Sequence, residues 1–249
     1  MSKQIRTNPI IAANRCIEAV KKETDSVILM CSLGKDSIVT LDLIYPHFKR
    51  IVCVFMYFVK GLEHIERWIA WVKTKYPKVE FVQVPHFALS YVLKYGTYCT
   101  PHPKQRQMNL NKVVTSLRMK TGIDYVFLGM KICDSMNRNL MIKQLAPTYV
   151  SKGMCYPLAE FTQKQVLSYM RMRHLPKPVM YGSAQFSDKA EVGSASNGIS
   201  LNLDCFLWLR KYAPHDLEKI YAVFPMSRRI LFEYDYRKSL EVSNDDAKD

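Results

Sequence analysis

The chain has 249 residues, of which 48% are hydrophobic and 23% charged, the balance of an ordinary globular protein. No apolar run approaches the roughly 20 residues of a bilayer-spanning helix, and the N-terminal apolar run is too short for a signal peptide. We therefore expect a cytoplasmic protein with no membrane partner. Lysine and arginine exceed aspartate and glutamate by 14, which favours an anionic ligand, a nucleic acid or an acidic protein partner.

The first half of the chain alternates between strand-like and helical patterns. Strands are predicted at 26–31, 51–58, 79–84 and 123–128, and helices at 11–22, 37–45, 62–76 and 110–117. The first two strand segments are continuous apolar runs, which are typical of strands buried on both faces of a parallel sheet. This alternation predicts an α/β fold, a mostly parallel twisted sheet with helices on both faces.

The pattern changes after residue 150. A capping box at Thr162 and Gln165 predicts the start of a helix that runs to Arg173, and two further helices are predicted at 203–212 and 214–223. We expect three parts: an α/β domain at 1–150, a mainly helical C-terminal extension packed on it at 151–238, and a polar tail at 239–249.

A short polar loop joins the first predicted strand to the helix that follows it. Its residues are Ser32, Leu33, Gly34, Lys35, Asp36 and Ser37. Such a loop aims backbone N–H groups and a helix N-terminus at one point, which attracts phosphate. Gly34 permits close approach of an anion, and Lys35 adds a positive charge. The alternative is an ordinary strand-to-helix turn capped by Asp36.

A second polar segment, residues 129–138, follows the fourth predicted strand. Ligands of parallel sheets bind at the carboxyl ends of the strands, so we expect Gly129, Lys131 and Arg138 to lie near the first loop. The alternative for the two cations is a pair of solvated loop charges.

Four segments together resemble one known family. The loop at 32–37 is similar to the S-G-G-x-D-S signature of the PP-loop ATP pyrophosphatases, which have a HUP-like fold. Segments 129–138, 156–169 and 175–181 resemble the motifs G-x-R-x-x-E-S-x-x-R, P-L-x-x-W-T-x-x-D-V-x-x-Y and L-P-x-x-P-L-Y of the phosphoadenosine phosphosulfate (PAPS) reductase family. The matches occur in the family's order and extend over residues 25–185.

The resemblance implies a nucleotide site on the two loops. Residues 32–37 and Gly129 would bind the nucleotide, and Lys35, Asp36, Lys131 and Arg138 would act in catalysis. The implied ligand is ATP or a PAPS-like adenine nucleotide, with Mg²⁺. Cleavage of an α–β phosphate bond concentrates negative charge, which fixed cations and N–H donors stabilise.

The chain departs from the family pattern at several points. Leu33 stands where the family has a glycine, so we expect this position to avoid a glycine-type backbone conformation. Lys131 replaces an arginine, which keeps the charge and loses bidentate recognition. The family's E-C-G-L-H motif is absent. A catalytic thiol would have to be Cys205, in an apolar helical stripe, or Cys99, whose basic neighbours could lower its pKa.

The seven cysteines are dispersed and form no C-x-x-C pair, so we expect no iron–sulfur cluster and no metal site. The missing cysteine motif favours a transferase that splits the α–β bond of ATP and adenylylates a small anionic substrate. One alternative is a PAPS reductase of sulfur metabolism. Another, of a different class, is a nucleic-acid-associated nucleotide-binding partner protein, which the net charge of +14 permits and no nucleic-acid-binding motif supports.

Overall fold

The structure is a computed structural model and describes residues 8–177 and 203–245. Its described residues divide into two compact units. Unit 1 is drawn from Met1–Met56, Ile69–Val84 and Asn111–Pro178, and unit 2 from Tyr57–Trp68, Pro85–Leu110 and Val179–Asp249. The division of the chain at residue 150 stays a prediction.

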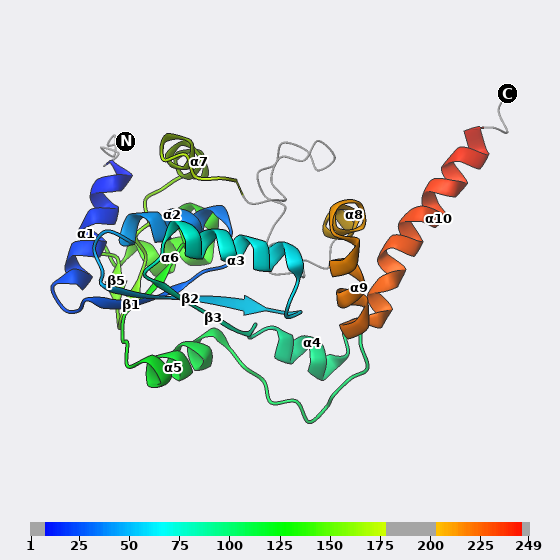
Figure 1. Cartoon of the computed structure of the whole chain (residues 1–249), viewed down its shortest axis with the longest axis horizontal. Helices are drawn as coiled ribbons and strands as arrows, with labels where there is room; N and C mark the ends of the chain where they lie inside the picture. Colours follow the sequence, from blue (N-terminus) through cyan, green and yellow to red (C-terminus); the bar gives the residue numbers. More distant parts are fainter. Residues whose placement is uncertain (1–7, 178–202, 246–249) are drawn as a thin grey trace. The chain divides into compact units, whose positions relative to one another are not determined.

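A six-stranded sheet forms the centre of unit 1 (Figure 1). Its strands, in chain order, are β1 (Ser26–Met30), β2 (Arg50–Tyr57), β3 (Val79–Pro85), β4 (Val126–Leu128), β5 (Val150–Ser151) and β6 (Met154–Cys155). They lie side by side in the order β3-β2-β1-β4-β6-β5. The pairs β1–β2, β1–β4 and β4–β6 are parallel, and β5–β6 is antiparallel.

Helices cover the sheet on both faces, as Figure 1 shows for α2 on one side and α5 on the other. The helices of this part of the chain are α1 (Pro9–Lys21), α2 (Lys35–Ile44), α3 (Glu63–Lys75), α5 (Leu110–Thr121), α6 (Met136–Lys143) and α7 (Gln163–Met172), with a short 3₁₀ helix, η1 (Ile132–Asp134). Because helices cover both faces of the sheet, the central strand β1 lies in the core, and its residues Val27, Ile28 and Leu29 are fully buried. The predicted fold class is confirmed.

The strand order places a topological switch point between β1 and β4. The chain moves from β1 to β2 and β3 on one side, and then returns to β4 on the other side of β1. Connections that leave β1 and β4 therefore diverge, which opens a crevice at the carboxyl ends of these two strands. The two polar loops of the sequence, 32–37 and 129–138, are these connections.

A buried carboxylate ties α7 to α2 within unit 1. Asp42 accepts hydrogen bonds from the hydroxyls of Tyr76 at 2.9 Å and Tyr169 at 2.8 Å, and from Nε of Arg173 at 2.9 Å. Helix α7 begins at the predicted capping box, in which Thr162 Oγ1 accepts from the backbone N–H of Gln165. The third family-like segment is thereby fixed beside the first loop's helix.

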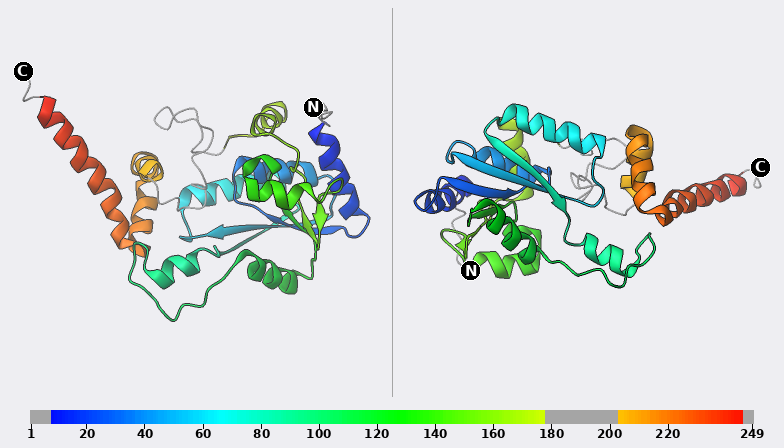
Figure 2. Two further views of the ribbon diagram at one scale, coloured as in Figure 1. Left: turned by 180° about the vertical axis from the view of Figure 1, so that it is seen from behind. Right: turned by 60° about the horizontal axis from the view of Figure 1, so that its bottom comes forward.

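Unit 2 is mainly helical (Figure 2). It contains the first turns of α3, then α4 (Leu89–Tyr95), α8 (Leu203–Tyr212), α9 (Pro214–Val223), a 3₁₀ helix η3 (Pro225–Ser227) and α10 (Arg228–Asp245). Helix α8 packs against both α9 and α10. Of the described helices, none combines the length and the apolar character that a membrane span requires.

Candidate functional site

The first loop turns sharply between β1 and α2. Leu33 adopts a left-handed backbone conformation with φ of 62°, and Gly34 is the N-cap residue of α2. The expectation that Leu33 avoids a glycine-type conformation was therefore wrong. Leu33 is fully buried, and burial of a leucine side chain outweighs the ~1–2 kcal/mol that the left-handed region costs an L-residue.

The hydroxyl groups at the start of α2 stabilise the turn itself. Ser37 Oγ donates to the carbonyl of Gly34 at 2.9 Å, and Thr40 Oγ1 donates to the carbonyl of Asp36 at 2.8 Å. The backbone N–H groups of the first turn of an α-helix have no partner within the helix, and its dipole favours negative charge at this end. The loop thus has the geometry of an anion site.

The second loop lies directly against the first. A Cβ atom added to Gly129 would lie 3.0 Å from the carbonyl carbon of Asp36, which is tighter than ordinary van der Waals contact, so a side chain here would press on the first loop. After it, Lys131 opens η1, and the backbone N–H of Ile132 donates to the carbonyl of Ala159 at 3.0 Å. The two loops meet in space, as the rule for parallel sheets predicted, and segment 156–161, which only the resemblance linked to them, lies against the second loop.

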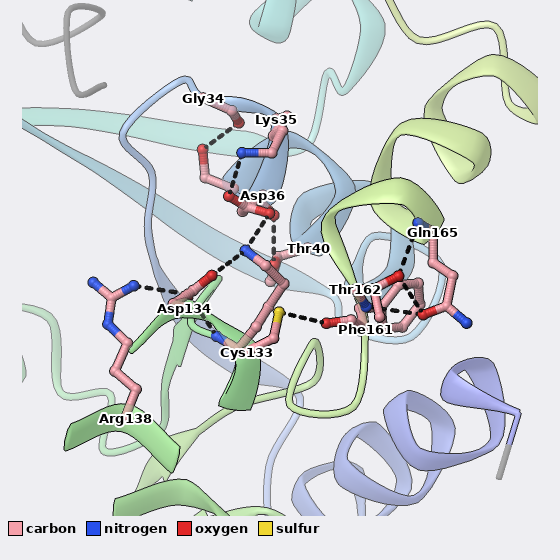
Figure 3. A network of polar contacts seen from close by, with 12 residues as sticks. Gly34, Lys35, Asp36, Thr40, Cys133, Asp134, Arg138, Phe161, Thr162 and Gln165 are labelled. Carbon is pink, nitrogen blue, oxygen red and sulfur yellow. Dashed lines mark hydrogen bonds and ion pairs between the residues drawn. The ribbon is translucent and has the colours of Figure 1, made fainter. Parts of the chain in front are cut away.

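Lysines and aspartates of the two loops form a buried ionic network (Figure 3). Nζ of Lys131 lies 2.8 Å from Oδ1 of Asp36 and 2.8 Å from Oδ1 of Asp134. Nζ of Lys35 lies 3.3 Å from Oδ2 of Asp36. The side chains of Lys35 and Lys131 are only 4% and 3% exposed, which excludes the alternative of a solvated loop charge for Lys131.

Arg138 extends the network toward solvent. Its Nη1 donates to Oδ2 of Asp134 at 2.7 Å, and its side chain is 42% exposed. Burial opposes ionisation of Asp134, but hydrogen bonds from Lys131 and the charge of Arg138 hold its pKa below the usual range. Asp134 was not among the predicted site residues, because the sequence alone does not show that this carboxylate turns back toward Lys131.

The network contains three cations and two carboxylates, so one positive charge remains uncompensated within it. The carboxylates fix the ammonium groups in position before any ligand arrives, which is the arrangement that electrostatic catalysis requires. The predicted residues Gly34, Lys35, Asp36, Gly129 and Lys131 are thus brought together. Their roles in binding and catalysis stay predictions.

The structure confirms that Cys205 is buried in its helix and corrects the expectation for Cys99. Cys205 and Cys99 are only 1% and 5% exposed, and burial raises the pKa of Cys99, which corrects the expected lowering by its basic neighbours. Cys133, in contrast, is exposed, and its Sγ donates to the carbonyl of Phe161 at 3.3 Å. The sequence analysis missed this thiol, although it lies inside the segment 129–138 that was already assigned to the site.

Comparison with known proteins shows which family and which proteins this chain is similar to. The sequence profile of the phosphoadenosine phosphosulfate reductase domain matches residues 26–193. The adenosine 5′-phosphosulfate reductase of Geobacillus kaustophilus is 28% identical over 168 residues, which cover 66% of this chain and 70% of that protein. The motif at 175–181 falls inside the matched range, but its residues from 178 onward lie outside the described structure.

Two solved structures have a similar fold. The U34-tRNA thiolase NcsA from Methanococcus maripaludis, with its [4Fe–4S] cluster, gives a TM-score of 0.46 at 18% identity and covers 89% of this chain and 77% of that one. The PAPS reductase from Candida auris, in a phosphate complex, gives 0.45 at 16% identity and covers 71% and 84%.

The cofactor expectation needs correction. The sequence led us to expect ATP with Mg²⁺ and no iron–sulfur cluster, whereas NcsA, one of the two structures compared, carries a [4Fe–4S] cluster. Within residues 8–177 and 203–245, no three His, Cys, Asp or Glu side chains are grouped so that they could hold a metal ion.

Proposed function

Because the chain belongs to the phosphoadenosine phosphosulfate reductase domain family, we propose that it reductively cleaves an adenylyl sulfate, the mixed anhydride of adenosine 5′-phosphate and sulfate. One observation carries the proposal: the exposed thiol of Cys133 lies on the same short loop as the cations of the ionic network. The name of the Geobacillus relative supports the same substrate class. This reading replaces ATP-dependent adenylyl transfer as the preferred function.

The ionic network fits the leaving group of such a reaction. When the sulfur–oxygen bond breaks, negative charge accumulates on the phosphate oxygen of the released nucleotide. The N-terminus of α2 and the ammonium groups of Lys35 and Lys131 supply positive potential there, and Arg138 offers a planar pair of donors to an anion. Each of these groups is positioned by Asp36 or Asp134, so little reorganisation is needed.

The thiol completes the reaction. The thiolate of Cys133 attacks the sulfur atom, the bond from sulfur to the bridging oxygen breaks, and the adenosine phosphate leaves with that electron pair. The protein then carries a cysteine S-sulfonate. A dithiol reductant attacks Sγ of this adduct and displaces sulfite, and its second thiol closes a disulfide on the reductant and restores Cys133.

The decisive experiment measures sulfite release from adenylyl sulfate, with and without a 3′-phosphate, in the presence of a dithiol protein. We expect sulfite with the wild type, none with Cys133→Ser, and unchanged release with the matched control Cys205→Ser. Mass spectrometry of wild type without reductant should find one SO₃ group on the peptide that contains Cys133. Retained sulfite release in Cys133→Ser would remove the thiol assignment. Pyrophosphate release from ATP without any sulfite would instead overturn the proposed reaction.

A further inference from the structure

Unit 2 contains a cavity of its own, with no residue of the ionic network in its wall. It has a volume of about 490 Å³ and is lined by residues from the first turns of α3 and from the junction of α8 with α9. Small-molecule sites in proteins typically fall between ~300 and 1,000 Å³. The wall is largely aromatic, with Trp68, Trp208 and Tyr212, and Arg67 adds a cation.

A buried histidine–aspartate pair belongs to this wall. Oδ2 of Asp216 lies 2.6 Å from Nδ1 of His64, and the carboxylate also accepts the backbone N–H groups of Glu63 and His64 at 2.6 and 3.0 Å. The side chains of Asp216 and His64 are 1% and 9% exposed. A carboxylate acceptor at Nδ1 fixes the proton of the neutral imidazole on that nitrogen and leaves a lone pair on Nε2.

The lone pair of His64 Nε2 accepts no hydrogen bond from the residues that the structure describes. Nε2 of His64 is buried and finds no hydrogen-bond partner among the described residues. Burial lowers the pKa of His64 more than the neighbouring carboxylate raises it, so the ring stays neutral and Nε2 stays an acceptor at neutral pH. A buried acceptor without a donor is costly, and such groups in native proteins usually have a ligand or water as partner.

The pocket combines this acceptor with ring surfaces. The ring of Trp208 lies 5.5 Å from the ring of His64 and 5.5 Å from that of Tyr212, and the ammonium of Lys211 lies 5.1 Å from the centre of the Tyr212 ring. Flat heteroaromatic rings stack on such surfaces, and nucleobases do so whatever their sequence context. Arg67, which lies 3.7 Å from Oε2 of Glu63 in the same wall, supplies a cation for a phosphate attached to such a ring.

We propose that this cavity binds an amino-bearing nucleobase, whose exocyclic N–H donates to Nε2 of His64 while its ring stacks on the aromatic wall. The site goes beyond the proposed reductase reaction, which uses only residues of unit 1. The same chemistry is offered by a free nucleoside and by one base of a single-stranded nucleic acid, and the experiment below distinguishes the two sources. The net charge of +14 favours a phosphate-bearing ligand in either case.

The tryptophans supply a direct readout. The chain has three tryptophans, and two of them, Trp68 and Trp208, line the cavity. In a Trp71→Phe background, fluorescence therefore reports on the cavity alone. The probes are adenosine, purine riboside, which lacks the exocyclic amino group, and a short single-stranded adenine oligonucleotide.

We expect saturable quenching by adenosine, with purine riboside at least about tenfold weaker because it cannot donate to Nε2. His64→Phe should abolish this discrimination. Tyr212→Ala changes a side chain that is 51% exposed, so it should fold normally and weaken adenosine about fivefold or more through lost stacking. Lys35→Ala, a control for the phosphate loop, should leave quenching by adenosine unchanged.

The remaining outcomes are equally informative. Tighter binding of the oligonucleotide than of adenosine assigns the site to a single-stranded nucleic acid, and equal or weaker binding assigns it to a free nucleoside. Three results would overturn the proposal: no saturable quenching by adenosine or oligonucleotide, equal affinity for purine riboside in the wild-type cavity, or discrimination that survives in His64→Phe.

Discussion

Replacement of Lys131 by methionine tests how much the ionic network contributes to the stability of the protein. Methionine preserves most of the volume of the buried stem but removes the ammonium group that lies 2.8 Å from both Asp36 and Asp134. The two carboxylates then face each other with only Lys35 and Arg138 to compensate them. We expect a less stable protein, because Asp36 and Asp134 both lose the ammonium group that holds them together, while both stay largely removed from water.

The magnitude follows from the exposure of the partners. Breaking a fully buried ion pair costs about 3–5 kcal/mol. The side chains of Asp36 and Asp134 are 26% and 16% exposed, so water reaches both, and we expect the smaller loss of about 2–3 kcal/mol. For a chain of this size that corresponds to roughly 4–12 °C in the melting temperature.

Equilibrium unfolding in urea, followed by circular dichroism, measures this change. Lys131→Arg, which keeps the charge, is the matched control and should lose less stability than Lys131→Met. Adding Asp36→Asn and Asp134→Asn to Lys131→Met should recover part of the loss, because the repelling charges are then gone. An unfolding midpoint of Lys131→Met equal to that of the wild type would refute the reasoning.

Three further predictions concern the scaffold. Asp42→Ala leaves the hydroxyls of Tyr76 and Tyr169 without their acceptor and should lower the free energy of unfolding in urea by about 2–3 kcal/mol. Asp42→Asn, which keeps one acceptor oxygen, should lower it less. Leu33→Gly relieves the left-handed conformation but removes a fully buried side chain, so a net loss of about 2 kcal/mol is expected, and a more stable variant would contradict this balance. Burial lowers the pKa of His86 below its usual value of 6.5. As the pH drops below about 6.5, the unfolded chain therefore binds a proton that the folded protein does not bind, and the free energy of unfolding should decrease. In His86→Asn this decrease, measured by urea unfolding at pH 7.5 and 5.5, should be smaller.

The sequence predicted the long elements well and the short ones poorly. All four predicted strands are confirmed as β1 to β4, because buried parallel strands carry continuous apolar runs. Strands β5 and β6 have two residues each, too few for any periodicity, and they were missed. Helix α10 was also missed: it carries no regular apolar stripe, which is the signal on which sequence-based assignment depends.

For the candidate site, the sequence predicted where the two loops lie in the fold better than it predicted their backbone conformation. Strand–loop–helix order and the switch-point rule were enough to bring residues 32–37 and 129–138 to one edge of the sheet. The left-handed conformation of Leu33 could not be predicted, because propensity opposes it and only tertiary burial stabilises it. Exposure of Cys133 was equally hidden, since it depends on how η1 docks on segment 156–161.

With a lysine at position 131, the two cations of the second loop are suited to different functions. An ammonium group is a point charge with three donors, so Lys131 can satisfy Asp36 and Asp134 together while it stays 97% buried. A guanidinium in the same place would direct its planar fork at a single carboxylate or at a ligand. Lys131 is therefore suited to joining the two loops, and direct recognition of an anion falls to Arg138, whose planar donors are 42% exposed. With a lysine at 131, bidentate recognition of an anion by this segment rests on Arg138, in the first turn of α6.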